Sequence, residues 1–174
     1  MSHLEPHYRM TPPERLPPKD RQPVHVVLHN IRSAFNVGSI FRTADAGSVA
    51  RLHLCGYTAC PPNAKLQKTA LGAFDYVPWT HHETLADCFS HLRAESIPIA
   101  AVERVEDSVS HTRYEWPQPV AVVFGNEVRG LTLEELEAVD AVVSIPMLGH
   151  KNTINVATAF GIVLFEILRR WRAV

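Results

Sequence analysis

The sequence predicts an α/β protein in which helices cover both faces of a mostly parallel sheet. Short apolar runs alternate with helical patterns from Val24 to the end of the chain, which is the pattern of a covered parallel sheet. Two buried runs, residues 120–124 and 141–145, each end at a loop rich in Gly and Asn. Such loops at strand ends present backbone donors and acceptors, so we expect one ligand pocket there. The alternative is that these loops are ordinary β-to-α turns, in which Gly is present only because its backbone can adopt a positive φ.

The length of 174 residues favours one domain with a sizeable core. Its hydrophobic fraction of 46% and charged fraction of 20% are those of a globular protein. We see neither a signal peptide nor an apolar stretch of the roughly 18 residues that a membrane span needs, and therefore expect a cytoplasmic protein without a membrane partner. The net charge of −1 neither requires nor excludes a nucleic-acid partner.

Two segments differ in composition. Residues 1–23 are rich in proline, which disfavours a helix, so we expect an extended N-terminal arm. The basic residues of this arm could contact phosphate, although a solvated leader is the ordinary explanation and the one we favour. We expect residues 24–174 to form the folded domain, because no linker or internal repeat interrupts them.

The remaining elements follow from local patterns. Further strands are expected at residues 24–29, 51–55 and 97–102, with an extended segment at 76–79. Helices are expected at residues 40–47, 64–73, 84–95 and 133–139, and from about 153 to the C-terminus. Residues 30–39 are expected to be a polar loop, and residues 103–116 to be irregular. We expect Gly47 to follow the first helix in the left-handed region, and Thr132 and Glu135 to form a capping box.

The terminal helical pattern has almost no polar face between Ile154 and Trp171. A helix that is apolar all round must be buried on more than one side. We therefore expect the sheet to cover one side and a second copy of the chain to cover the other. The basic residues at its end suit the negative pole of the helix or could contact phosphate, and the sequence does not choose between them.

Charged and metal-binding side chains give weaker signals. Arg42 lies among apolar residues, where an ion pair with Asp45 or extension to solvent is the ordinary explanation and a ligand contact is the alternative. The ten histidines have no convincing metal-ligand spacing, so we expect no metal. The three cysteines form no C-x-x-C pair, so a disulfide framework is not expected. Signatures of P-loop, dinucleotide-binding and serine-hydrolase sites are missing.

Three motifs together resemble the signatures of the SpoU (TrmH-type) RNA 2′-O-ribose methyltransferases of the SPOUT superfamily. The first is Asn30-x-Arg32-x-x-x-Asn36-x-Gly38-x-x-x-Arg42-Thr43-Ala44-Asp45. The second is Phe124-Gly125-Asn126-Glu127-x-x-Gly130-Leu131. The third is Ile145-Pro146-Met147-x-Gly149-x-x-Asn152-Thr153-Ile154-Asn155-Val156-Ala157. The third departs from the usual Ser-Leu-Asn-Val-Ser, but Thr153 keeps the hydroxyl and Ile154 keeps the bulk.

The resemblance implies a C-terminal trefoil knot, a homodimer and S-adenosylmethionine as cofactor. It implies a methyl transfer to a ribose 2′-hydroxyl of RNA, with tRNA favoured over rRNA. Catalytic roles are implied for Arg42, Asn36, Glu127 and Asn155, with Arg42 either as base or as phosphate clamp. Cofactor contacts are implied for Phe124, Gly125, Asn126, Ile145, Met147, Gly149, Ile154 and Asn155. RNA contacts are implied for Asn30, Arg32 and Arg42.

A non-catalytic RNA-binding module, or a nucleotide-binding module with the same fold, is the alternative. A lack of cofactor binding in isothermal titration would favour it. The predicted position of the cofactor leads us to expect that Gly125→Val blocks the pocket and leaves the fold intact.

Overall fold

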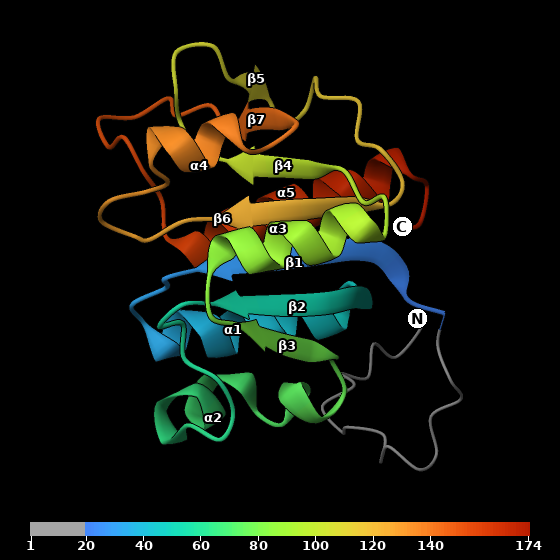
Figure 1. Cartoon of the computed structure of the whole chain (residues 1–174), viewed down its shortest axis with the longest axis vertical. Coiled ribbons are helices and arrows are strands. Elements are labelled where there is room, and N and C mark those ends of the chain that lie inside the picture. Colours follow the sequence, from blue (N-terminus) through green and yellow to red (C-terminus); the bar gives the residue numbers. More distant parts are fainter. Residues whose placement is uncertain (1–19) are drawn as a thin grey trace, which may run out of the picture.

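Seven parallel strands form one sheet in the computed structural model, which describes residues 20–174 (Figure 1). Their order across the sheet is β3-β2-β1-β6-β4-β7-β5. The strands are β1 (Gln22–His29), β2 (Val49–Cys55), β3 (Trp79–His82), β4 (Ile99–Val102), β5 (Val109–Ser110), β6 (Val120–Phe124) and β7 (Ala141–Ser144). The predicted α/β class is confirmed. The predicted proline-rich arm lies almost entirely outside the described residues.

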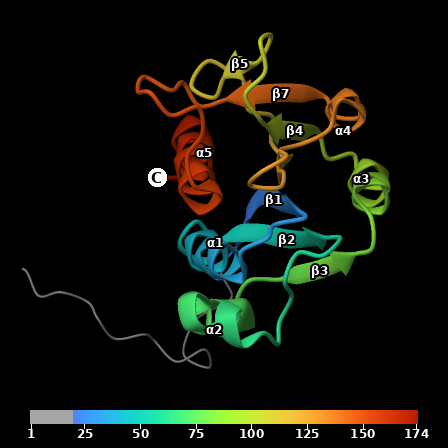
Figure 2. The ribbon, with the colours of Figure 1, turned by 90° about the vertical axis from the view of Figure 1, so that its left-hand side faces the viewer.

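Helices cover both faces of the sheet (Figure 2). The helices on one face are α1 (Ala34–Ala46), α2 (Ala64–Ala70) and α5 (Val156–Arg170), and those on the other are α3 (Leu85–Ala94) and α4 (Leu133–Glu137). A short 3₁₀ turn, η2 (Ala73–Asp75), follows α2. Each face therefore has its own apolar core, one packed under α1 and α5 and the other under α3. None of the helices in residues 20–174 has the length and apolar character that a membrane crossing requires.

The start of α1 differs from the prediction. The helix begins at Ala34, six residues before the predicted start, because Ser33 caps it: the Ser33 hydroxyl accepts a hydrogen bond from the Asn36 amide at 3.3 Å. Asn36 is therefore held on a helix and not in a loop. The left-handed residue after the helix is Ser48 (φ 50°), whereas Gly47 has φ −90°.

Gly47 instead makes room for α5, because a Cβ at this position would lie 2.7 Å from Leu164 Cδ2 on that helix. The close approach of α1 and α5, and not the turn, explains this glycine. Two other predicted boundaries are wrong: the extended segment becomes a strand only at Trp79, after the η2 turn, and residues 103–116 contain the short strand β5. The predicted capping box of Thr132 and Glu135 is confirmed.

The terminal helix α5 buries one face against the sheet and α1. Its buried residues are Val156, Phe160, Val163, Leu164, Ile167 and Leu168. On the opposite side, Ile162 is 39% exposed and Phe165 is 43% exposed. Near the end of the helix, Glu166 pairs with Arg169 and Arg170. The single chain thus leaves part of the apolar surface of α5 uncovered, as the sequence predicts.

Three histidines stand side by side on β1, β2 and β3, on the face that α3 covers. His25 Nδ1 lies 3.0 Å from His53 Nε2, and His53 Nδ1 lies 2.9 Å from His82 Nε2. Burial, followed by the charges of the neighbouring histidines, lowers the pKa of His53 to about 3. Burial also lowers the pKa of His25 and His82. The three imidazoles are therefore neutral at pH 7 and form a hydrogen-bonded row.

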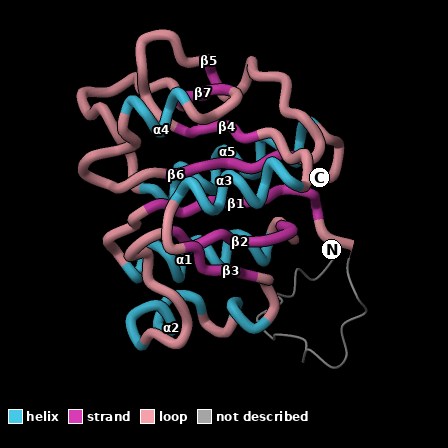
Figure 3. Tube along the Cα trace, viewed as in Figure 1, coloured by secondary structure: helices cyan, strands magenta, loops and turns pink. Residues whose placement is uncertain are grey.

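The chain order reverses at the centre of the sheet. After β1, the chain adds β2 and β3 on one side, and β4 then starts the other side, two positions away from β1. The strand β6 later fills the gap between them. Ligand sites of open α/β sheets lie at such reversals, beyond the carboxyl ends of the strands. Figure 3 shows the loops that follow β6 and β7 at this edge of the sheet.

Candidate functional site

A cleft of about 800 Å³ opens where the carboxyl ends of β6 and β4 meet the N-terminal ends of α1 and α5. Segments from all three sequence motifs line it. The predicted site residues that line this cleft are Arg32, Asn36, Phe124, Gly125, Asn126, Glu127, Ile154 and Asn155. The fold therefore brings together, in one place, side chains that lie more than 100 residues apart in the sequence.

A chain of hydrogen bonds joins the three motifs at the cleft. The Glu127 carboxylate accepts from the backbone amides of Arg32 at 2.7 Å and Ser33 at 3.2 Å, and from Asn36 Nδ2 at 3.0 Å. Asn36 Oδ1 in turn accepts from Asn155 Nδ2 at 3.0 Å. Asn36 is the central link, because its carbonyl faces one partner and its amide faces the other.

Each end of this chain of hydrogen bonds holds the N-terminus of a helix in place. Asn155 Oδ1 caps α5 by accepting from the Ala157 amide at 2.9 Å and the Thr158 amide at 3.4 Å. Glu127 holds the segment that leads into α1. Burial raises the pKa of Glu127, but the hydrogen bonds from Arg32, Asn36 and Ser33 outweigh it, so the pKa lies below its usual value. Glu127 is therefore ionised at neutral pH and acts as a fixed acceptor.

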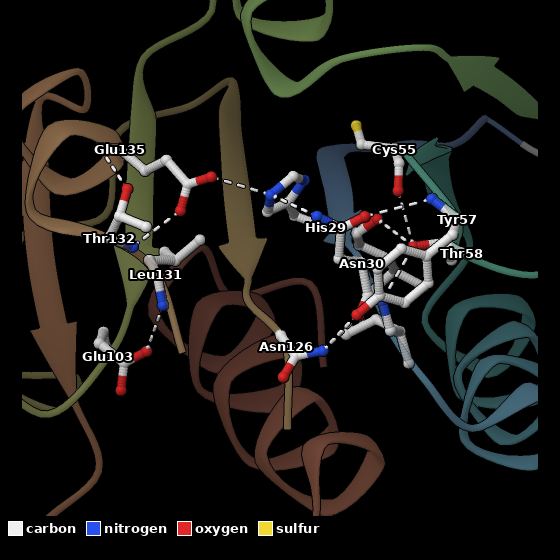
Figure 4. A network of polar contacts seen from close by, with 12 residues as sticks. His29, Asn30, Cys55, Tyr57, Thr58, Glu103, Asn126, Leu131, Thr132 and Glu135 are labelled. Atoms are coloured by element: carbon white, nitrogen blue, oxygen red, sulfur yellow. Dashed lines mark hydrogen bonds and ion pairs between the residues drawn. The ribbon is translucent and has the colours of Figure 1, made fainter. Parts of the chain in front are cut away.

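Asn126 organises the loop between β6 and α4. Its side-chain carbonyl accepts from the amides of Val128 and Arg129, each at 3.0 Å. Its amide donates to the Asn30 carbonyl at 2.9 Å and to the Tyr57 hydroxyl at 2.7 Å (Figure 4). These four bonds occupy the donors and acceptors of the side chain, so any ligand contact of Asn126 would come from its backbone.

Asn30 connects three loops at the same edge (Figure 4). Its side-chain carbonyl accepts from the Tyr57 amide at 3.2 Å, and its Nδ2 lies 2.9 Å from His29 Nε2. The left-handed backbone of Asn30 (φ 54°) lets the chain turn from β1 towards α1. The predicted RNA contact of Asn30 stays a prediction, and its side chain already has partners inside the protein.

Gly125 lets the loop after β6 fold back on itself. A Cβ at this position would lie 2.7 Å from the Gly130 carbonyl carbon and 2.8 Å from Leu131 Cγ. A larger side chain would therefore displace the backbone of the loop before it filled the cleft. The expectation that Gly125→Val blocks the pocket with the fold intact is corrected by this contact.

The sequence matches the model of the SpoU rRNA Methylase family over residues 23–165. The chain belongs to this family. One relative, the tRNA (guanosine(18)-2′-O)-methyltransferase of Escherichia coli (strain K12), is 29% identical over 154 residues, which cover 86% of this chain and 65% of the relative. This chain therefore spans about two thirds of the length of that relative.

Two solved structures have a similar fold. The AdoMet-bound rRNA methyltransferase from Sinorhizobium meliloti has a TM-score of 0.79 and 29% identity, over 92% of this chain and 61% of that chain. A structure concerned with the 2-OH methylation of C/U34 on tRNA has a TM-score of 0.79 and 26% identity, over 87% of this chain and 97% of that chain. These similarities confirm the predicted SpoU resemblance, and the trefoil knot stays a prediction.

The other predicted residues of the SpoU motifs lie apart from the main cleft. Ile145 and Met147 line a smaller cavity of about 100 Å³, which shares Ile154 with the cleft. Gly149 is exposed and lines neither space. Arg42 is exposed on α1 outside the cleft. Within residues 20–174 its guanidinium forms no ion pair or hydrogen bond, so the suggested ion pair with Asp45 is not formed.

Three cleft residues of this SpoU protein lie outside all three sequence motifs. Val102 and Glu103 follow β4, and Ala159 lies on α5, and all three line both cavities. The Glu103 carboxylate accepts from the Leu131 amide at 3.1 Å and the Arg104 amide at 3.0 Å. Val102 and Glu103 could be predicted from their place at the end of β4 only if the position of β4 between β6 and β7 were known.

Proposed function

We propose that this SpoU-family protein transfers a methyl group from S-adenosylmethionine to a ribose 2′-hydroxyl of tRNA. The observation that carries the proposal is the hydrogen-bonded chain of Glu127, Asn36 and Asn155, which unites the three family motifs at one cleft. A module that only binds RNA would not need these three motifs to meet beside a cavity of small-molecule size.

The cleft fits S-adenosylmethionine in size and chemistry. Its volume of about 800 Å³ lies within the usual range of about 300–1,000 Å³ for small-molecule sites. Val102, Ile154 and Ala159 offer apolar walls for the adenine ring, and the backbone around Gly125 offers polar groups for the ribose. The Glu103 carboxylate offers a negative charge to the cationic part of the molecule. The bound cofactor supplies the methyl group on a positively charged sulfur.

The protein itself has to position the hydroxyl and help it lose its proton. A hydroxyl is a poor nucleophile until the proton is removed, and correct alignment supplies much of the acceleration. Arg42 lies six residues beyond Asn36, about 9 Å further along α1. A guanidinium is effectively always protonated. We therefore assign Arg42 the role of a clamp that holds the RNA phosphate beside the reacting ribose.

Two other groups fit the RNA. Arg32 and Arg129 line the cleft, and both are exposed. These cations would neutralise phosphates and release counterions, so binding should weaken as salt increases. Only RNA offers the 2′-hydroxyl. A cytoplasmic location belongs to the same proposal, because the proposed RNA substrate is there.

The relatives suggest two nucleotides of tRNA, guanosine 18 and C/U34. We favour position 34, because the similarity covers 97% of the chain concerned with C/U34 and 65% of the guanosine 18 enzyme. Tritiated methyl transfer to tRNA and to rRNA, followed by identification of the labelled nucleosides, tests the proposal. Label on tRNA ribose at position 34 is expected. Label on a base would refute the reaction, and label only in rRNA would correct the substrate.

Ala159→Leu should weaken S-adenosylmethionine binding at least 10-fold, because the added side chain would occupy the cleft where Val102 and Ile154 form its walls. Leucine is a good helix former, so α5 should remain intact. Thr158→Leu adds the same side chain at an exposed position next to it and is the matched control. Isothermal titration measures both affinities. Equal affinities in the two variants would contradict the proposed cofactor position.

We expect a homodimer that covers the exposed apolar side chains of α5. Sedimentation at micromolar concentration should give twice the chain mass, and the double variant Ile162→Glu with Phe165→Glu should sediment as a monomer, because charges are excluded from such interfaces. Leu133→Glu is the control, since Leu133 is 73% exposed on α4, on the other face of the sheet. A monomeric parent protein would contradict the assembly.

A further inference from the structure

We propose that His53, His82 and Cys88 bind a zinc ion between α3 and the sheet. One ligand atom from each of these side chains lies within 4.8 Å of the other two. His53 and Cys88 are buried and His82 is half-buried. The residues come from β2, β3 and α3, on the opposite face of the sheet from α1 and α5, and none of them lines the cleft.

The two ring nitrogens lie slightly closer together than two ligands of one tetrahedral zinc ion would. His53 Nδ1 and His82 Nε2 lie 2.9 Å apart, and two nitrogens bound to one zinc ion at ordinary bond lengths lie about 3.4 Å apart. The two nitrogens would therefore have to move apart by about 0.5 Å to bind the same ion. Both rings are neutral, and one of the two nitrogens carries the proton of the hydrogen bond between them. That ring has to move its proton to its other nitrogen before both nitrogens offer a lone pair to the ion. Cys88 would bind as the thiolate and release its proton to solvent.

A neighbouring histidine can hold one of the ligands in its orientation, as metal sites require. A metal-bound histidine usually donates its second ring N–H to a fixed acceptor, which sets its orientation. His25 Nδ1 is 3.0 Å from His53 Nε2, so it can accept that hydrogen bond while His53 Nδ1 binds the ion. The row of histidines on β1, β2 and β3 thus supplies both the ligands and their support.

The fourth position belongs to His91 or to water. His91 lies one turn after Cys88 on α3, and its ring centre is 5.8 Å from the ring centres of both His53 and His82. It is exposed and lies 3.4 Å from Glu95, so its side chain can rotate towards the ion at little cost. Two imidazoles and a thiolate with a tetrahedral arrangement favour zinc over magnesium or calcium, which prefer oxygen ligands.

A simpler explanation is a row of hydrogen-bonded histidines without metal. A neutral imidazole has one donor and one acceptor, so His53 can satisfy both neighbours by itself. Cys88 also packs in the apolar core beside Cys55, whose side chain it contacts by a hydrogen bond. Its sulfur nevertheless lies within 4.8 Å of a ligand nitrogen of both His53 and His82, which the histidine row by itself does not require. The proposal departs from the sequence-based expectation of no metal, because the three ligands are brought together only by the sheet.

Cobalt titration of the metal-free full-length protein tests the site. Co²⁺ should produce a sulfur-to-metal charge-transfer band and the strong visible bands of tetrahedral cobalt, and Zn²⁺ should abolish them by displacement. Cys88→Ser should lose the charge-transfer band, and His82→Gln should lower the affinity at least 10-fold. Zn²⁺ should raise the melting temperature of the parent protein, and it should raise that of His82→Gln by less at the same metal concentration.

Two neighbouring variants are the controls. Cys60→Ser removes another thiol, and His81→Gln removes the adjacent histidine, whose Nε2 is hydrogen-bonded to the Gly56 carbonyl at 2.9 Å. Both variants should bind cobalt like the parent. No cobalt band in the parent, or a charge-transfer band that persists in a folded Cys88→Ser protein, would refute the site. Circular dichroism shows whether each variant is folded, and none of these measurements depends on methyl transfer.

Discussion

Replacement of Arg42 by alanine is expected to reduce methyl transfer by about 10²–10⁴-fold, as for other groups that position or activate a nucleophile. The affinity for S-adenosylmethionine should not change, because Arg42 does not line the cleft. The fold should not change either, since the side chain is exposed and forms no ion pair or hydrogen bond within the described part of the chain. Arg42→Lys should restore little activity, because a single ammonium cannot copy the planar fork that holds a phosphate.

Arg113→Ala is the matched control, since Arg113, like Arg42, is exposed and lies outside the cleft, but it belongs to none of the three motifs. Single-turnover methyl transfer to tRNA measures the rate, and isothermal titration measures the cofactor affinity. Activity of Arg42→Ala within a few fold of the parent would exclude its role in turnover. A parallel loss of rate and cofactor affinity would instead indicate that Arg42 shapes the cleft.

Asn155→Asp is expected to keep the fold and to lower kcat/KM about 100-fold, the cost of a misplaced positioning group. The carboxylate can still cap α5 by accepting from Ala157 and Thr158. It cannot donate to Asn36 Oδ1, so the hydrogen-bonded chain is broken at this link. Asn36 cannot compensate by rotating its amide, because its carbonyl would then face the carboxylate of Glu127.

Asn155→Ala loses both the cap and the link, so it should also lose about 0.5–2 kcal/mol of stability. Asn63 is the matched control, because it caps α2 by accepting from Lys65 and Leu66 but does not line the cleft. Asn63→Ala should lower the melting temperature without lowering kcat/KM. Full activity in Asn155→Asp would show that the bond between Asn155 and Asn36 is not needed for turnover.

The parts of the fold that were predicted correctly are those with a local signal. The run of residues 120–124 is apolar throughout, and the strand β6 that it predicts has the same bounds in the structure. The capping box of α4 needs only Thr132 and Glu135. The start of α1 was missed because Asn36, Val37 and Gly38 are weak helix formers, and the cap at Ser33 and the packing of the helix outweigh their propensity.

The site was predicted from three motifs, and its remaining residues depend on the order of the strands. Glu103 reaches the cleft only because β4 lies beside β6, and no local pattern encodes that neighbour. The same holds for the histidines of β1, β2 and β3, whose spacing in the sequence showed no metal pattern. The resemblance to a family predicts the roles of individual residues, whereas periodicity predicts only the elements that carry them.

The central position of β6 has a consequence for how the protein folds during synthesis. The ribosome completes β1, β2, β3, β4 and β5 before it makes β6. Until then, β1 has one unpaired edge, and β4 has neither of its neighbours, because both β6 and β7 come later. Exposed edges of this kind promote association of nascent chains. The sheet can therefore close only late, and we expect slow refolding that depends on protein concentration, as pairing between distant strands dictates.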